Sequence, residues 1–239
     1  MKLFKIKKSF MGKLLLIFFL AAPIYAQEFS VGSDFVSRYI WRGTDFGNSP
    51  SIQPTVAFST GGLTIGFWGA YATNDVYQET DFYGGYSVDL NNSGSLYLGF
   101  TDYMFPGAGF DISNFNNYDN SNGAGSHSIE INASYSGPEK LPISVAFNIF
   151  IHNVKDNPVY FELGYAVPVK DVNFSLFLGG SAGNGAAYYG STRKFDIVNT
   201  GIKASKEIKI TDSFSLPVFG SVFVNPATNS LFYVVGISL

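Results

Sequence analysis

From residue 27 onward the chain falls into segments of about ten residues in which apolar and polar side chains alternate. Successive side chains of a β-strand point to opposite faces, so each segment predicts a strand with one apolar and one polar face. Turn residues rich in Gly, Asn and Pro separate the segments. We expect twelve strands, at residues 29–42, 51–60, 63–73, 78–90, 95–105, 126–136, 143–153, 158–169, 172–181, 194–206, 214–224 and 230–239.

These strands predict an all-β fold, an antiparallel transmembrane β-barrel of about twelve strands. After residue 26 no apolar run approaches the roughly 20 residues that a spanning helix needs. A soluble β-sandwich would also alternate, with its apolar row packed inward. Aromatic residues make up 17% of the chain and charged residues 14%, and several aromatics stand near strand ends, which favours the membrane barrel. Short turns alternate with longer connections, of which 106–125 is the longest.

The N-terminus predicts a secretory signal peptide, residues 1–26, ahead of a barrel domain at 27–239. It combines five lysines, an apolar run at 14–22 and a small residue, Ala26, at the expected cleavage position. Removing the five lysines changes the formal net charge from −3 to −8, which argues against a nucleic-acid partner. The chain has no cysteine, so neither a lipoprotein anchor nor a disulfide is possible. We expect a cell outer membrane location, with outer-membrane lipid and the barrel-insertion machinery, which would recognise the alternating terminal strand, as partners.

The first predicted strand carries aromatic side chains on one face and charges on the other. We expect Phe35, Tyr39 and Trp41 to meet lipid or its interface. The opposite row is expected to face water inside the barrel, because an Arg on the lipid face costs roughly 2–4 kcal/mol near the midplane. The same reasoning, extended to the other strands, predicts pore-lining positions at Asp34, Arg38, Arg42, Glu79, Asp81, Glu130, Glu162 and Lys203.

The predicted function is an outer-membrane porin-like channel for passive diffusion of small hydrophilic solutes. Acidic residues exceed basic ones in the predicted lumen, so weak cation selectivity is expected. A barrel of twelve strands lies between the filled eight-stranded and the open sixteen-stranded classes. A structural or adhesive barrel, plugged by side chains and by residues 106–125, is therefore the alternative.

A third alternative is a lipid-modifying enzyme, which would use the two histidines of the chain. His127 falls on an apolar row and His152 on a polar row, so they should point apart. The chain is therefore expected not to be an enzyme. An Asp- and Asn-rich stretch starting at Asp119 has Ala124 where a calcium loop needs glycine, so no metal or cofactor is expected.

Several motifs in the first half resemble a known family. SDF followed by WRG, then SIQPTVAFSTGGLTIGFWGAYAT, TDFYGGYSVDL and LYLGFTDYMFPG, resemble in their order the TorF-like porin family of outer-membrane proteins. The resemblance covers roughly residues 33–107 by motif and the rest by architecture. It implies an outer-membrane channel.

Overall fold

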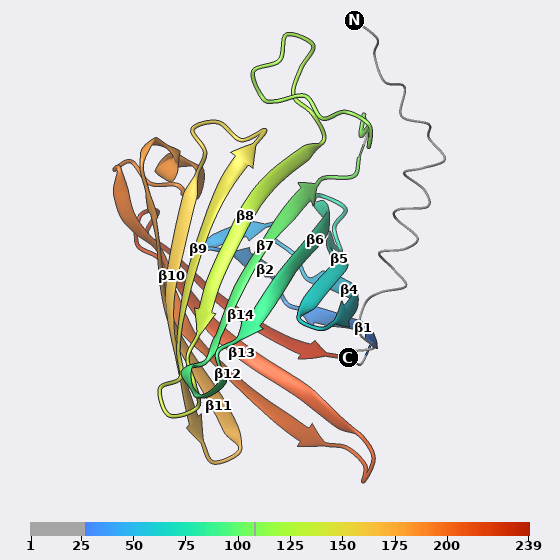
Figure 1. The fold of residues 1–239 in the computed structure, drawn as a ribbon, viewed down its shortest axis with the longest axis vertical. Coiled ribbons are helices and arrows are strands. Elements are labelled where there is room, and N and C mark those ends of the chain that lie inside the picture. Colours follow the sequence, from blue (N-terminus) through green and yellow to red (C-terminus); the bar gives the residue numbers. More distant parts are fainter. Residues whose placement is uncertain (1–26, 108) are drawn as a thin grey trace, which may run out of the picture.

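The computed structural model describes residues 27–107 and 109–239, which form one closed antiparallel barrel (Figure 1). The predicted signal peptide, 1–26, lies outside these residues. The barrel strands are β1 (Gln27–Val36), β4 (Ser51–Thr60), β5 (Leu63–Ala72), β6 (Gln78–Asp89), β7 (Ser95–Met104), β8 (His127–Ser136), β9 (Ile143–His152), β10 (Val159–Val169), β11 (Val172–Ala182), β12 (Phe195–Lys209), β13 (Ser215–Asn225) and β14 (Ser230–Ser238). The sequence prediction of a twelve-stranded all-β barrel is confirmed.

Each barrel strand pairs with its neighbours along the chain, and β1 pairs with both β4 and β14. Side chains alternate between the lumen and the outside, as the period of two predicts. In β10, Tyr160 faces the lumen and is buried, whereas Leu163 and Tyr165 point outward and are exposed. The outside of the barrel is thus lined by apolar side chains and the lumen by polar and aromatic ones.

The barrel has two unlike ends. Tight turns join β4 to β5, β6 to β7, β8 to β9, β10 to β11 and β12 to β13, at what we call the short-turn end. The longer connections 37–50, 105–126 and 183–194 lie at the opposite, long-loop end. In Figure 1 the long-loop end is at the top.

The first predicted strand, 29–42, is wrong in its second half. β1 ends at Val36, and the chain bends at Ser37 and Arg38. It then forms a separate hairpin of β2 (Tyr39–Trp41) and β3 (Thr44–Phe46), which belongs to no barrel sheet. Figure 1 shows this hairpin, in blue, within the outline of the barrel.

Two short 3-10 helices complete the fold, η1 (Asn91–Ser93) in a turn and η2 (Asn184–Tyr189) in the connection 183–194. No helix among residues 27–107 and 109–239 is long and apolar enough to cross a membrane. The buried cluster of Tyr160, Tyr189 and Val198 joins η2 to the lumen wall. The hairpin residue Trp41 packs against that cluster, so hairpin and helix share one core.

The barrel closes through a short seam. β1 and β14 share three residue pairs, Asp34–Ser238 to Val36–Gly236, whereas β1 and β4 share ten. Ser33 and Leu239 add two backbone hydrogen bonds of 2.9 and 3.0 Å to the seam. Two further bonds join Ser37 and Val235: the Ser37 amide donates to the Val235 carbonyl at 2.8 Å, and the Val235 amide donates to the Ser37 hydroxyl at 3.0 Å.

Candidate functional site

The hairpin of β2 and β3 turns through Arg42 and Gly43, both of which have positive φ (49° and 78°). Positive φ at both central residues characterises the tight turn that best matches the twist of a two-stranded hairpin. A Cβ on Gly43 would lie 2.0 Å from the carbonyl oxygen of Val198 in β12, so only glycine fits there. The Asn225 amide donates to the Gly43 carbonyl at 3.2 Å. The tip of the hairpin is therefore fixed against the β12–β13 wall.

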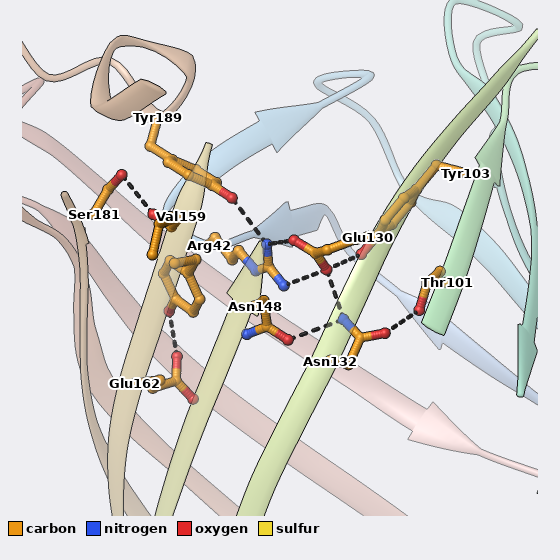
Figure 2. Close-up of polar contacts among 11 residues, drawn as sticks. Arg42, Thr101, Tyr103, Glu130, Asn132, Asn148, Val159, Glu162, Ser181 and Tyr189 are labelled. Carbon is orange, nitrogen blue, oxygen red and sulfur yellow. Dashed lines mark hydrogen bonds and ion pairs between the residues drawn. The ribbon is translucent and has the colours of Figure 1, made fainter. Parts of the chain in front are cut away.

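Arg42 reaches from this tip to Glu130 of β8 (Figure 2). Its two terminal nitrogens lie 2.6 and 2.9 Å from the two carboxylate oxygens of Glu130, a bidentate pair. Arg42 also donates to the Tyr189 hydroxyl at 2.9 Å, and Tyr103 donates to Glu130 at 2.9 Å. The Glu130 side chain is fully buried, so this pair ties the hairpin to the wall opposite Asn225.

A polar chain extends the Glu130 site along the wall. Asn132 donates to Glu130 at 2.8 Å and to Asn148 at 2.9 Å, and accepts from Thr101 at 2.9 Å. Figure 2 shows these amides lying between β7, β8 and β9. Because the amides are paired with one another and with the carboxylate, the site is held in one arrangement.

Aromatic rings surround the Arg42 guanidinium. Its carbon lies 4.3 Å from the centre of the Trp41 ring and 4.5 Å from that of Tyr160. These distances are in the range of cation–π contacts. Burial raises the pKa of Tyr188, next to Tyr189 on η2, to about 12, and burial also raises the pKa of Tyr189. Both phenols therefore stay neutral at physiological pH.

Two cavities lie beside the hairpin. The aromatic cavity, about 420 Å³, is lined by Tyr39, Trp41, Trp68, Asp81, Tyr83 and Tyr103, together with two threonines. The narrow cavity, about 20 Å³, lies nearer the long loops, and its lining includes Tyr77, Glu79, Phe105 and Tyr188. Tyr39, Trp41 and Tyr103 line both cavities, so these three rings separate a wide space from a narrow one.

Glu79 and Asp81 occupy neighbouring lumen-facing positions of β6, one at each cavity. Both are buried. Tyr77 donates to Glu79 at 2.5 Å. Among the described residues, the Oδ1 atom of Asp81 is buried without a hydrogen-bond partner.

Of the remaining predicted positions, Glu162 contacts this cluster through Tyr160, and the others lie at its periphery. Arg38 pairs with Asp45 at 3.2 Å, at the base of the hairpin. Asp34, Arg38 and Lys203 line a further cavity of about 170 Å³. Glu162 accepts from Tyr160 and, at 3.3 Å, from Asn199. Glu162 and Lys203 both line a space of about 390 Å³.

Two expectations about the first strand are wrong. Tyr39 and Trp41 do not meet lipid: Tyr39 is buried, and Trp41 packs against Tyr103 with ring centres 5.8 Å apart. Arg38 and Arg42 are not on β1, and Arg42 reaches Glu130 from the hairpin tip. The reason is that the chain leaves the wall at Ser37, so that the alternation after Val36 belongs to a hairpin inside the barrel. Phe35, by contrast, is on β1 and is exposed.

The aromatic part of the site was not predicted from the sequence. Trp68, Tyr83, Tyr103 and Tyr160 all stand on the polar row of their strands, opposite the apolar row. A large ring on a lumen-facing row needs apolar contacts inside the barrel. That placement was the available signal that something fills the lumen.

His127 packs at the rim, on the same strand face as Ile129. Its Nδ1 atom lies 2.7 Å from Asp102 and its Nε2 atom 2.9 Å from the Ile112 carbonyl. Its ring stacks on Phe115, with centres 3.8 Å apart. Nδ1 thus ties His127 to the neighbouring strand β7, whereas Nε2 and the stacked ring hold the loop 105–126 to the outer side of the rim.

Comparisons with known proteins agree with this architecture. A family model described as "Bacterial protein of unknown function (Gcw_chp)" matches residues 21–216. A comparison with curated protein sequences finds no match. Among solved structures, the fold is similar to a KdgM porin, with a TM-score of 0.51 and 14% sequence identity. The similarity covers 89% of this chain and 98% of that chain, and at this identity it shows the fold alone. With its family model spanning most of its length, the chain belongs to the Gcw_chp family of bacterial proteins of unknown function.

Proposed function

We propose that this protein is an outer-membrane porin-like channel for passive diffusion of small hydrophilic solutes, with weak selectivity for cations. The outward apolar side chains support a membrane location, because residues such as Val31, Leu98 and Leu231 are more than 60% exposed. Lipid can cover such a surface, and a closed barrel leaves no strand edge unpaired within it. The predicted signal peptide and the resemblance to the TorF-like porin family point to the same location and class.

The observation that carries the proposal is the placement of Glu79 and Asp81 on the two sides of one constriction. Glu79 faces the narrow cavity and Asp81 the aromatic cavity, and Tyr39, Trp41 and Tyr103 line both. A solute entering from the long-loop end would pass these rings with a carboxylate ahead of it and another behind. Rings of acidic side chains in a pore favour cations over anions.

The arginines of the hairpin region do not balance these carboxyls. Arg42 is paired to Glu130 in bidentate geometry, so its positive charge is balanced locally. Arg38 is likewise paired with Asp45. Glu79 and Asp81 have no such cationic partner among the described residues, so negative charge on either of them is not balanced by a neighbouring side chain.

Planar-bilayer recordings of the purified protein test the proposal. We expect discrete conductance steps and, in a salt gradient, a reversal potential of the sign that marks cation preference. The double variant Glu79→Gln and Asp81→Asn should move the reversal potential toward zero, because both side chains keep their shape and lose their charge. The matched control Glu139→Gln with Asp212→Asn removes two carboxylates from exposed turns and should leave the reversal potential unchanged.

The narrow cavity also favours a second candidate, the plugged structural barrel. About 20 Å³ has room for roughly one water molecule, so the constriction must widen for larger solutes to pass. A silent bilayer would select the plugged barrel. If conductance steps are seen and the double variant has the same ion selectivity as the parent, ions pass without contacting Glu79 and Asp81.

A further inference from the structure

The aromatic cavity combines features that recur where proteins bind organic cations. Its walls are the rings of Tyr39, Trp41, Trp68, Tyr83 and Tyr103, and its charged lining residue is Asp81. We propose that this cavity binds an organic ammonium ion, with Asp81 as the counter-charge and the rings as walls. The inference rests on the proposed channel, because it names the class of solute that the channel would favour.

The charge of the lining decides the sign of the ligand. Asp81 lines the cavity, and no Lys, Arg or His does so among the described residues. Glu79, two positions earlier on the same face of β6, adds a second buried carboxylate nearby. An anionic solute would have to approach two buried carboxyl groups, whereas a cation would stabilise their ionised form.

Asp81 also has a vacant acceptor. Its side chain is 95% buried, since its exposure is 5%, and its Oδ1 atom lacks a hydrogen-bond partner among the described residues. A buried acceptor left without a partner is costly, and such groups in native proteins need an explanation. A ligand that brings positive charge and polarised hydrogen atoms to this carboxylate would supply one.

The rings come from four different elements and face a common space. Tyr39 on β2 lies 5.4 Å, centre to centre, from Trp68 on β5, and Trp41 lies 5.8 Å from Tyr103 on β7. Faces of Trp and Tyr attract cations, and aromatic cages recognise quaternary ammonium groups in this way. A neutral sugar could stack on the same rings, but it would leave the carboxylate charge uncompensated. The volume of about 420 Å³ is in the range of small-molecule pockets.

The two tryptophans of the chain, Trp41 and Trp68, both line this cavity, so intrinsic fluorescence reports on its occupation. We would titrate the purified, detergent-solubilised protein with choline, with its uncharged isostere carrying a tert-butyl group, and with glucose. Choline should shift the tryptophan emission in a saturable manner. The isostere and glucose should bind about tenfold more weakly or not at all, because neither carries charge for Asp81.

Two variants test the contacts. Asp81→Asn should weaken choline binding about tenfold, and Tyr83→Leu, which removes one wall, about threefold. Glu139→Gln is the control that removes an exposed carboxylate and should bind choline as the parent does. Heat-modifiable gel migration confirms that each variant remains a folded barrel.

The outcomes separate this inference from the channel. Equal affinity for choline and its isostere, or no loss in a folded Asp81→Asn variant, would overturn the ammonium site, and neither result depends on conductance. If bilayers show no current while choline binding is saturable and depends on Asp81, the ammonium site is supported and the channel proposal is rejected. If both hold, choline should reduce the potassium current of the parent and not that of Asp81→Asn.

Discussion

The two halves of the barrel lumen are built from the same strands and differ in what fills them. Toward the long loops, Glu79, Asp81 and Glu130 are buried beneath the hairpin and η2. Toward the short turns the same strands carry exposed side chains: in β12, burial ends at Asn199 and the last four residues are exposed. Strand alternation therefore sets the wall along its whole length, and the connections decide which half of the lumen is closed.

The largest expected effect comes from removing the hairpin. Val36 and Ser51 face each other as a residue pair, so a short Gly-Ser turn can replace residues 37–50. Without Tyr39 and Trp41 the two cavities merge, and the single-channel conductance should rise severalfold. Shortening 107–125 in the same way is the control. The His127 contacts of that loop lie on the outer side of the rim, so conductance should change little. Unchanged conductance in the hairpin variant would show that the hairpin is not the constriction.

A second test compares one carboxylate from each half. Glu130→Gln leaves the Arg42 guanidinium buried beside a neutral amide, which should cost about 3–5 kcal/mol of stability. Glu207→Gln changes an exposed position near the short turns, so its urea midpoint of unfolding should equal that of the parent. Urea titration in lipid vesicles, followed by tryptophan emission, measures both. Equal midpoints for the two variants would mean that the half of the lumen containing the hairpin is no more stable than the half toward the short turns.

The hairpin turn supplies a smaller effect. Gly43→Ala places a methyl group against the Val198 carbonyl in a backbone region that L-residues avoid, which should cost about 2 kcal/mol. Gly107→Ala is the matched control, since a Cβ there meets no atom within 4 Å and its φ is not in the left-handed region. Protease cleavage near residues 37–50 should speed up in the first variant and stay as in the parent in the second.

The smallest effect is expected at the short-turn end. The hydrogen-bonded Lys206 ammonium, 2.5 Å away, lowers the pKa of Asp171 below its ordinary range. This pair therefore adds stability above the ordinary aspartate pKa, and that addition fades as pH falls through the lowered value. Both side chains are exposed, so the addition is small. Asp171→Asn should therefore lose a small amount of stability in urea at neutral pH and match the parent at acid pH, and an equal loss at both pH values would contradict this.

Most of the wall could be predicted from the sequence because alternation is a property of the strand itself. The predicted ranges 51–60, 63–73 and 78–90 agree within one residue with β4, β5 and β6. Each is bounded by turn chemistry that local residues determine, such as the Gly61–Gly62 pair with positive φ.

The position of the hairpin inside the barrel could not be predicted because the same alternating pattern occurs in two environments. Tyr39, Ile40 and Trp41 alternate in continuity with β1, and a ring on an apolar row reads as lipid-facing when the lumen is taken to be wet. Whether Trp41 meets lipid or Tyr189 depends on η2, which is almost 150 positions away in the chain. The pairing of Arg42 with Glu130 across 88 positions has no local signal either.

The short seam between β1 and β14 has a consequence for the order of folding. The seam joins the two ends of the described chain through three residue pairs, and the hairpin that follows β1 adds the Asn225–Gly43 bond across 182 positions. Contacts so distant in sequence form late, because loop-closure entropy must be overcome before they stabilise anything. Neighbouring strands from β4 to β14 can zip successively through local hairpins, which leaves closure as the slow step. The hairpin inside the barrel then stabilises the closed seam. Its loss should raise the rate at which the seam opens more than it lowers the rate at which the sheet forms.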